Sequence, residues 1–477
     1  MRDLCAMDYS CLNAYTVDDE ISVDKALSQE LKNFKRKIVV LDDDPTGVQT
    51  VHDISVFTDW KRDTVEKGFL EENSLFFILT NSRSFLPEYT IKVHREIAKN
   101  IVAASKASGK DFIVISRSDS TLRGNYPIET QVLKDEIEQL TRKRFNGEII
   151  FPFFKGGERF TIDNIHYVKS GDKLLPAGMT EFARDKTFGY KSSHLGDWCE
   201  EKTHGAFKAS DMIYISLEDL RSRNFDHIEE QLTSCRGFNK IIVNSIDYID
   251  VKVFMTAFIR AVNKGMEFIF RSAADAVKVI GGITDKPLLV KKDLIKEGDV
   301  NGGVIIVGSH VNRTTQQLAE LKNCHNKVKF IEFNQHLVLR DGGLEGEVKR
   351  VVPLIENEIR LGNIAVVYTR RDRLDMDSSR ADEQLTVSVK ISESVSSIVA
   401  KLSVRPGFII AKGGITSSDI GIKALGVRRA DVMGQIKPGI PVWRTGAESK
   451  FPNMPFIIFP GNVGGESTLK DVVDLLG

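Results

Sequence analysis

The sequence has few cysteines, no surplus of charge of either sign and no long apolar run. Its 477 residues include five cysteines, none in a Cys-x-x-Cys pair, so a zinc ribbon or redox motif has no support. Lysine plus arginine and aspartate plus glutamate each number 66, which argues against nucleic-acid binding and against attachment to anionic lipid. Apolar runs such as Ile149–Phe154 fall far short of the roughly 18 residues of a membrane-spanning helix.

Two common nucleotide-binding motifs are also missing. No G-x-x-x-x-G-K-[ST] run occurs, since Gly109-Lys110 is followed by Asp111, and no G-x-G-x-x-G follows a strand. P-loop and NAD-dependent enzymes are therefore disfavoured, whereas kinases of other folds remain open. The first residues, with Asp3 and Asp8, do not fit a secretory signal. We expect a soluble, cytoplasmic protein with reduced thiols that binds neither nucleic acid nor membrane.

Short β-branched runs alternate with helical patterns along most of the chain. The first alternation starts at the apolar run 37–41, and a second starts at 304 after a polar, glycine-bearing stretch at 281–303. We therefore predict an α/β fold with two domains, each with a mostly parallel sheet flanked by helices. The expected division is an N-terminal tail at 1–36, an acceptor-substrate domain at 37–290 and a nucleotide-binding domain at 300–477.

The loops that follow the predicted strands are rich in glycine, hydroxyl, aspartate and arginine residues. Ligands of open α/β sheets bind beyond the carboxyl ends of the strands, and six such loops exceed what turn chemistry alone would supply. The first half contributes carboxylates and arginines: Asp42, Asp43, Asp44, Arg83, Arg117, Asp119 and Arg123. The second half contributes glycine and hydroxyl residues before helix starts: Gly308, Ser309, Gly413, Gly414, Thr416, Ser417, Gly461, Gly464 and Gly465.

Each of these two sets suits a different ligand. Arginine binds a carboxylate through two parallel hydrogen bonds, so the first set suits a small anionic acceptor with a general base beside it. Backbone N–H groups at glycine-rich helix starts suit phosphate groups, so the second set suits a nucleotide. Together they predict phosphoryl transfer, with the active site in the interdomain cleft.

A competing pattern lies after the first predicted strand. The strand followed by Asp42-x-Asp44-x-Thr46 fits the haloacid-dehalogenase phosphatases, in which the first aspartate is the nucleophile and Mg²⁺ binds nearby. That family also needs a late acidic pair after a strand, and neither Thr369–Arg373 nor the loop after Lys412 provides it. A phosphatase that uses Asp42 stays as an alternative.

The motifs of both halves resemble the four-carbon acid sugar kinases, formerly a domain of unknown function, with members likened to D-threonate, D-erythronate and 3-oxo-tetronate kinases. The resemblance covers roughly residues 37–475. Its most specific part is Arg117–Asn125, which is similar to the family's K-x-D-S-T-L-R-G-N. Six further segments also resemble family motifs. In chain order the motifs are A-D-D-x-T-G, S-x-R-S, P-x-x-G-R-x-T, S-G-S, G-G-E-T-S and S-G-N-x-G, and the segments are 43–47, 81–84, 157–161, 307–309, 413–417 and 460–464.

This resemblance implies an ATP-dependent kinase that phosphorylates a hydroxyl of a four-carbon sugar acid, with ATP and Mg²⁺ as cofactors. Asp43 or Asp44 would accept the proton of the hydroxyl. The residues implied to line the acid-sugar site are Arg83, Arg117, Asp119, Arg123 and Arg159. Those implied to contact ATP are Ser309, Gly413, Gly414, Ile415, Thr416, Gly461 and Gly464. The metal ligands, the particular acid, the hydroxyl and the presence of a homo-oligomer stay open.

Three positions depart from the family pattern. Ile415 stands at the acidic position of G-G-E-T-S, Arg117 stands at the lysine of K-x-D-S-T, and Asp42 precedes the aspartate pair. The change at Ile415 supports a second alternative, a non-catalytic ligand-binding or effector protein of the same fold.

Overall fold

The computed structural model describes residues 5–15, 19–372, 374, 381–461 and 463–477. The chain forms two compact units, Met1–Gly47 with Asp59–Asp285, and Val48–Thr58 with Lys286–Gly477. Residues 48–58 thus belong to the second unit, although the sequence pattern assigns them to the first domain. The reason is that β3 (Ile54–Phe57) pairs antiparallel with β17 (Arg429–Lys437) of the second unit.

The first unit is built on a parallel sheet with the strand order β10-β11-β6-β12-β5-β2-β4. Several of these strands are buried along their whole length, as expected where helices cover both faces. Their bounds are β2 (Lys37–Asp42), β4 (Leu75–Leu79), β5 (Phe112–Arg117), β6 (Gly147–Phe151), β10 (Ile213–Ile215), β11 (Asn239–Val243) and β12 (Phe268–Ser272).

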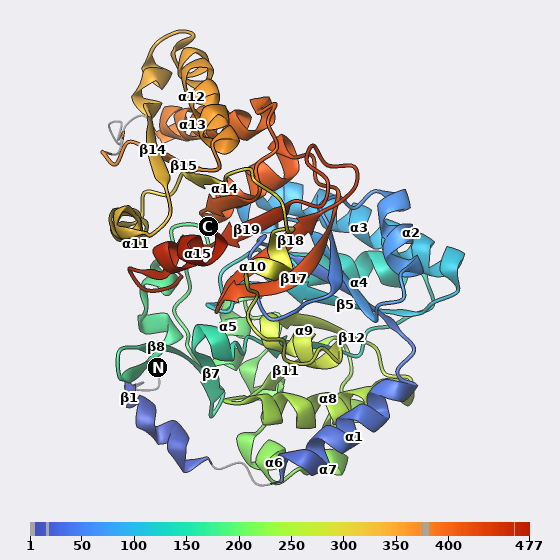
Figure 1. The fold of residues 1–477 in the computed structure, drawn as a ribbon. Coiled ribbons are helices and arrows are strands. Elements are labelled where there is room, and N and C mark those ends of the chain that lie inside the picture. The colour runs from blue at the N-terminus through green and yellow to red at the C-terminus, as the bar shows by residue number, and fades with distance from the viewer. Residues whose placement is uncertain (1–4, 16–18, 373, 375–380, 462) are drawn as a thin grey trace. The chain divides into compact units, whose positions relative to one another are not determined.

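The helices of the first unit form two packed groups (Figure 1). One group consists of α2 (Arg62–Leu70), α3 (Pro87–Ser108) and α4 (Ile128–Leu140). The other consists of α1 (Glu20–Asn33), α6 (Leu217–Arg221), α7 (Phe225–Ser234), α8 (Tyr248–Asn263) and α9 (Ala274–Ile280). Part of the predicted N-terminal tail is therefore packed structure, since α1 lies against α8 with Val23 and Leu27 buried.

A small antiparallel sheet stands apart from the large one in the first unit. Its strands β1 (Met7–Asp8), β7 (Arg159–Ile162), β8 (Ile165–Ser170) and β9 (Lys173–Pro176) run in the order β1-β9-β8-β7. Helix α5 (Leu195–Lys202) follows it, and buried Trp198 stacks on Tyr126 with ring centroids 4.5 Å apart. In this segment the strand–helix alternation of the first unit is interrupted.

The second unit has the strand order β3-β17-β18-β19-β16-β13-β15-β14. The strands from β19 to β14 are parallel, and those from β3 to β18 are antiparallel. The remaining bounds are β13 (Val304–Val307), β14 (Val328–Phe333), β15 (Ile364–Thr369), β16 (Ile409–Lys412), β18 (Ile440–Thr445) and β19 (Pro455–Phe459).

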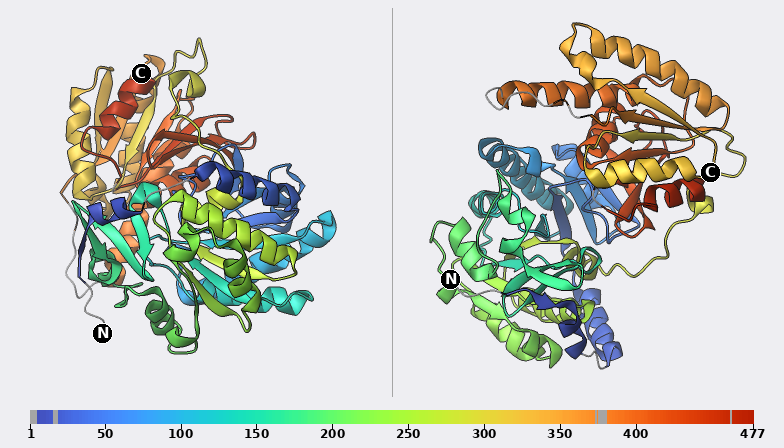
Figure 2. Two further views of the ribbon diagram at one scale, coloured as in Figure 1. Left: turned by 90° about the horizontal axis from the view of Figure 1, so that it is seen from below. Right: turned by 90° about the vertical axis from the view of Figure 1, so that its left-hand side faces the viewer.

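Helices cover both faces of the parallel strands in this unit. Figure 2 (right) shows α11 and α15 together on one side and α12 and α13 on the other. Leu318, Leu469 and Val473 from the first pair pack with Ile305, Ile410 and Ile457 in one apolar core. The helix bounds are α10 (Lys291–Leu294), α11 (Asn312–Glu320), α12 (Gly343–Arg360), α13 (Ala381–Lys401), α14 (Gly414–Asp419) and α15 (Thr468–Leu476).

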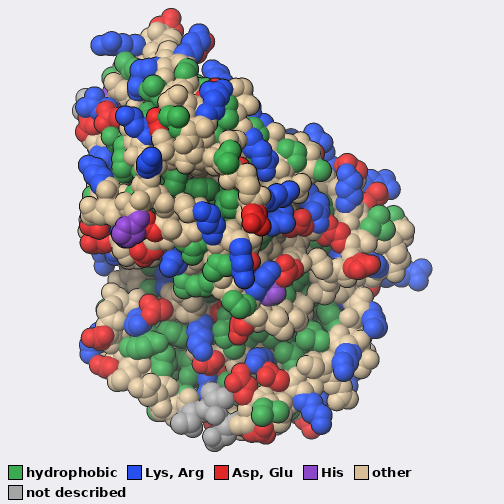
Figure 3. Space-filling view, in the orientation of Figure 1, with side chains coloured by type: hydrophobic (Ala, Val, Ile, Leu, Met, Phe, Trp, Pro, Cys, Tyr) green, Lys and Arg blue, Asp and Glu red, His purple; other side chains and the backbone are tan. Residues whose placement is uncertain are grey.

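Acidic and basic side chains are interspersed on the face drawn in Figure 3, as the balanced composition predicts. In the part of the chain that the structure describes, no helix has the length and apolar content needed to cross a membrane.

Candidate functional site

Three neighbouring strands of the first unit end in the loops singled out from the sequence. The register pairs Asp42 of β2 with Leu79 of β4 and with Arg117 of β5. Because these strands are parallel, the loops after 42, 79 and 117 start at the same edge of the sheet. Thr80 tightens this edge, since its backbone N–H and its hydroxyl both donate to the Asp42 carbonyl at 2.9 Å.

Asp43 and Arg83 form a two-point ion pair. Arg83 Nη2 donates to Asp43 Oδ1 at 2.6 Å and Arg83 Nε donates to Asp43 Oδ2 at 3.1 Å. Burial raises the pKa of the Asp43 carboxyl, and the arginine acts against that rise. Burial acts to lower the pKa of Arg83, but the neighbouring aspartates hold it well above its usual value, so the guanidinium stays charged. This geometry is the arrangement by which arginine binds a carboxylate.

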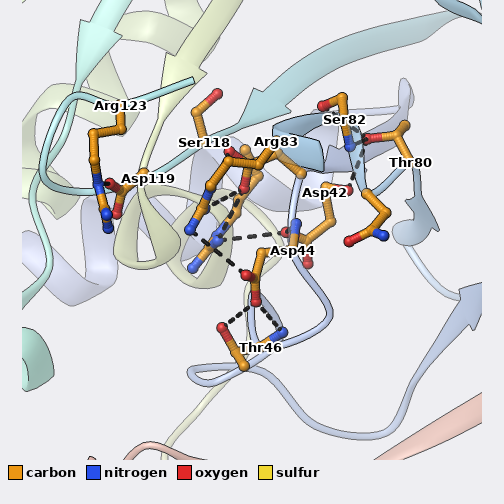
Figure 4. A network of polar contacts seen from close by, with 12 residues as sticks. Asp42, Asp44, Thr46, Thr80, Ser82, Arg83, Ser118, Asp119 and Arg123 are labelled. Atoms are coloured by element: carbon orange, nitrogen blue, oxygen red, sulfur yellow. Dashed lines mark hydrogen bonds and ion pairs between the residues drawn. The ribbon is translucent and has the colours of Figure 1, made fainter. Parts of the chain in front are cut away.

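Asp44 has a more open environment than Asp43. Its Oδ1 accepts hydrogen bonds from the Thr46 backbone N–H at 2.9 Å and the Thr46 hydroxyl at 2.6 Å. Its Oδ2 lies 3.6 Å from Arg83 Nη1, and 22% of the side chain is exposed. Burial opposes the effect of Arg83 and Thr46, yet their contacts leave the pKa of Asp44 below its usual value. Figure 4 shows Thr46, Asp44 and Arg83 linked by these contacts.

Asp42 is buried against the backbone of its own loop. A Cβ at Gly47 would lie 2.0 Å from either Asp42 carboxylate oxygen, so this loop closes only with glycine there. Burial, together with the charges of Asp43 and Asp44, raises the pKa of Asp42 to about 8, although Arg117 Nη1 lies 3.4 Å from Asp42 Oδ1. Arg117 is itself buried and also lies 3.8 Å from Asp43 Oδ1.

Replacement of Asp42 by Asn is expected to change how stability depends on pH. Between pH 4 and 8 the folded protein keeps a proton on Asp42 that the unfolded chain has lost, so stability falls as pH rises. Relative to Asp42→Asn, the wild-type free energy of unfolding should fall by about 1 kcal/mol per pH unit. Denaturant unfolding at pH 5, 6 and 7 measures this, and equal pH slopes for the two proteins would contradict it. The exposed Asp63 provides the control Asp63→Asn, which should keep the wild-type slope.

The loop after β5 places Asp119 and Arg123 together. Asp119 Oδ2 accepts from Arg123 Nε at 2.7 Å and from the Thr121 hydroxyl. Burial acts against them, but Arg83, Arg123 and Thr121 hold the pKa of Asp119 well below its usual value. The backbone of the loop is specialised, with φ of 69° at Leu122 and 122° at Gly124, and a Cβ at Gly124 would lie 3.6 Å from Asp43 Oδ2.

Arg159 reaches the same region from the small sheet. Its guanidinium lies over the Phe182 ring at 5.7 Å, and that of Arg123 lies over the same ring at 5.0 Å. Burial lowers the pKa of Arg159, and Asp119 acts against this. All seven residues expected at the acid-sugar site, Asp43, Asp44, Arg83, Arg117, Asp119, Arg123 and Arg159, thus lie in one unit and are connected by short contacts or charge interactions.

Buried polar residues that the sequence pattern did not indicate support these loops. Arg271 of β12 donates to the carbonyls of Asp119 at 3.4 Å and Arg123 at 3.1 Å. Glu129 accepts from the Ser82 hydroxyl at 2.6 Å. His166 is buried with its Nε2 2.7 Å from the Ser120 carbonyl, and burial lowers its pKa to about 3. His166 is therefore neutral and structural.

The second unit has a cavity of about 550 Å³ at the carboxyl ends of its parallel strands. One part of the lining is polar and glycine-rich, and the rest is apolar. The glycine-rich part includes Gly308, Ser309, Gly413, Gly414, Thr416 and Gly461, and the apolar part includes Val311, Leu374, Ile391, Val395 and Ile415. Ligand pockets combine apolar walls with a few well-placed polar groups in this way.

Close packing of the three glycine loops explains why glycine is needed there. A Cβ at Gly308 would lie 2.5 Å from Thr416 Oγ1, and one at Gly461 would lie 3.2 Å from Ser309 Oγ. Gly413 has a φ of 121°, which side-chain-bearing residues rarely adopt. Thr314 of α11 also joins the loops, because its hydroxyl donates to the Gly461 carbonyl at 3.1 Å.

The remaining expected ATP contacts differ in their placement. Ile415 lines the cavity and is 72% exposed. Asp419 also lines it, accepts from the Ser392 hydroxyl at 2.6 Å and pairs with Lys423. Gly464 lies outside the lining, and Gln317 binds the carbonyls beside it at Val463 and Gly465. The motif residue Asn462 lies outside the described residues.

Replacement of Gly413 by Ala is expected to weaken nucleotide binding. The backbone there has positive φ, and the new Cβ would meet Ser309 Cβ at 3.3 Å, so the loop must shift at a cost of roughly 1 to 3 kcal/mol. Affinity for ADP should fall by about ten- to a hundredfold, measured by calorimetry. Gly346, on α12 with open space around its Cβ, provides the control Gly346→Ala, for which unchanged affinity is expected. Equal affinity of Gly413→Ala and wild type would contradict the role of this loop.

The two sites define a class: a two-domain α/β protein with an acid-and-arginine site in one unit and a glycine-lined, nucleotide-type pocket in the other. A sugar-binding N-terminal domain model matches residues 38–279, and a nucleotide-binding C-terminal domain model matches residues 304–469. The chain therefore belongs to the four-carbon acid sugar kinase family, as its motifs predict.

Two solved structures show the same fold. A Salmonella typhimurium LT2 protein provisionally named a tRNA synthase has a TM-score of 0.63 and 16% identity, over 91% of this chain and 98% of that chain. Haemophilus influenzae protein HI1011, of the DUF1537 family, has a TM-score of 0.59 with the same identity and coverage. The comparison with curated proteins yields no match.

Proposed function

We propose that this protein is an ATP-dependent kinase that phosphorylates a hydroxyl of a small, four-carbon sugar acid. The observation that carries the proposal is the pairing of a sugar-binding domain that holds the Asp43–Arg83 cluster with a nucleotide-binding domain that holds the glycine-lined cavity. Direct transfer requires the terminal phosphate of ATP and the acceptor hydroxyl to meet in one reaction site.

The arginines support an acidic acceptor. Arg83 is partly exposed and remains charged, and the guanidinium groups of Arg123 and Arg159 both lie over the Phe182 ring. Guanidinium groups fixed in this way can bind a carboxylate with two parallel hydrogen bonds. Arg117 is more deeply buried beside Asp42 and Asp43, which favours a role in holding the aspartates over direct contact with the acid.

Among the aspartates, Asp44 is the best placed to accept the proton of the hydroxyl. Both oxygens of Asp43 are bound by Arg83, whereas Asp44 Oδ2 has only the longer 3.6 Å contact and its side chain is partly exposed. The lowered pKa keeps Asp44 ionised at neutral pH. Phosphoryl transfer asks mainly for positioning and charge neutralisation, so a weak base in the correct place suffices.

The cavity of the second unit suits the nucleotide. Backbone N–H groups of the Gly413–Gly414 and Gly461 loops suit phosphates, and the apolar wall of Val311, Ile415 and their neighbours suits a base. Within the described ranges, no three or more side chains of His, Cys, Asp or Glu gather as a metal cage. Mg²⁺ commonly binds through substrate phosphates and water, and here it would neutralise phosphate charge.

The phosphatase alternative fits the geometry less well. A nucleophilic aspartate must reach a phosphorus atom. Asp42 is instead buried with its carboxylate against Gly47, and it holds a proton at neutral pH. The non-catalytic alternative rests on Ile415, which is part of the cavity wall.

A panel of four-carbon sugar acids, each incubated with ATP and Mg²⁺, tests the proposal through ADP release. We expect release that depends on one acid or a few. ATP binding without release for any acid would favour the non-catalytic alternative. Phosphate release from sugar phosphates without ATP, lost in Asp42→Asn, would favour the phosphatase.

A further inference from the structure

A buried lysine lies directly behind the glycine loops of the cavity. Lys412 is the last residue of β16, precedes Gly413 and has no exposed surface. Its Nζ donates to the Pro460 carbonyl at 2.6 Å and to the Gly461 carbonyl at 3.3 Å. The ammonium also lies 4.0 Å from the centre of the Phe459 ring. Lys412 therefore ties two of the cavity's three glycine loops together.

This lysine has no acidic partner among the residues that the structure describes. Its two hydrogen-bond acceptors are neutral carbonyls, and an unpaired buried ammonium is costly. Burial lowers the pKa of Lys412 to about 7, and the positive charge of Arg313 on α11 adds to this effect.

Among the described residues, no acidic group of the surrounding elements forms an ion pair with Lys412. Strands β13 and β19, which flank β16, carry no charged residue. The other described charged groups on α11, α14, α15 and the loop after β19 are Glu320, Asp419, Glu466, Lys470, Asp471 and Asp474, and Asp419 pairs with Lys423. With no ion-pair partner among the described residues, Lys412 lacks the counter-charge that a bound anion could supply.

We propose that Lys412 is a positioning residue whose counter-charge is the phosphates of the bound nucleotide, and that nucleotide binding takes up a proton at its Nζ. The proposal rests on the proposed nucleotide site. Lys412 directly precedes Gly413 and donates to the Gly461 carbonyl, and both glycines line the cavity. Phosphates bound there would therefore lie close to the ammonium, and the medium between them is of low polarity. The bonds from Lys412 and Thr314 also satisfy the Gly461 carbonyl, which would otherwise repel an anion.

The sign of the pH dependence follows from this arrangement. Without nucleotide, Lys412 loses its proton as the pH rises above about 7, and with nucleotide it keeps the proton to a higher pH. Affinity for ADP should therefore be greatest below about pH 7 and should fall about tenfold for each pH unit above it. At pH 8, ADP binding should take up most of one proton per site.

Calorimetry of ADP binding in two buffers of different ionisation enthalpy measures the proton uptake. Uptake of most of one proton by the wild-type protein at pH 8, and a much smaller uptake by Lys412→Met, would support the proposal. Subtracting the proton uptake of Lys412→Met from that of the wild type removes the contribution of protons exchanged by ADP itself. Equal uptake by both proteins would overturn the role of Lys412 alone, and absence of ADP binding to the wild type would overturn the nucleotide site as well.

Lys412→Arg tests the same point without removing the charge. Arginine stays protonated, so the affinity of the Lys412→Arg protein for ADP should change little between pH 7 and 8.5, while that of the wild type falls about tenfold or more. Lys349→Met, at an exposed position of α12, should retain the wild-type pH profile and proton uptake. If Lys412→Met does not fold, a wild-type affinity that is independent of pH above 7 still overturns the proposal.

Discussion

Replacement of Asp44 by Asn is expected to lower the kcat of acid-sugar phosphorylation by about 100-fold or more, because it removes the proposed general base. The substitution keeps the size of the side chain and an oxygen that can accept from Thr46, so the loop should keep its shape. Since Arg83 and Thr46 hold its folded-state pKa below the usual value despite burial, Asp44 should stay ionised through the neutral range. Steady-state kinetics with ATP in excess provides the measurement.

The control for this prediction is Asp63→Asn on α2, where the carboxylate is 70% exposed. This variant should have wild-type kcat. If Asp44→Asn kept kcat within about twofold of wild type, proton transfer to Asp44 would have no part in the reaction. A comparable loss in Asp43→Asn alone would instead place the base at Asp43.

Replacement of Arg83 by Gln is expected to affect both stability and substrate binding. Asp43 would lose both of its short contacts while its side chain stays 3% exposed, and removal of one partner of such a buried pair costs about 3 to 5 kcal/mol. The KM for the sugar acid should rise about tenfold or more, because the charge proposed to bind its carboxylate is gone. The KM for ATP should change little.

Thermal unfolding and the two KM values separate these effects. Arg62→Gln, at a 68% exposed position of α2, should leave stability and both KM values near wild type. A variant Arg83→Gln with unchanged KM for the acid would show that Arg83 serves only to hold Asp43.

The parallel sheets could be predicted from the sequence because their strands are continuous apolar runs. The runs at 37–41 and 304–307 become β2 and β13, and the loops after them carry the site residues as expected. The position of Asp42, Asp43 and Asp44 at a sheet edge follows from this pattern alone. Their proximity to Arg83 and Arg117 follows from parallel pairing.

Other features depend on contacts that no local pattern specifies. The pairing of β3 with β17 moves residues 48–58 into the second unit, and a strand of four residues gives no sign of its distant partner. Lys412 and Arg271 lie in strands, where a charged residue usually indicates an exposed face, yet both are buried and bind loop carbonyls. Their roles become visible only when those carbonyls are placed.

Two departures from the family pattern prove to be neighbours. Asp42 precedes the usual aspartate pair and Arg117 stands at the usual lysine, and the two side chains lie 3.4 Å apart. The guanidinium faces both Asp42 and Asp43, so the extra acid and the altered base are accommodated together. Ile415, the third departure, is not matched by either of the other two changes, and its side chain forms part of the cavity wall.

In the proposed reaction, one phosphoryl group passes from ATP to a four-carbon sugar acid. Labelling the γ-phosphate of ATP and following the label in the acid that releases ADP tests it directly. We predict one labelled phosphorylated acid for each ADP formed, and no transfer to the matching sugar that lacks the carboxylate. ADP release with all of the label in inorganic phosphate, or no turnover with any acid while ATP still binds, would contradict the proposed transfer.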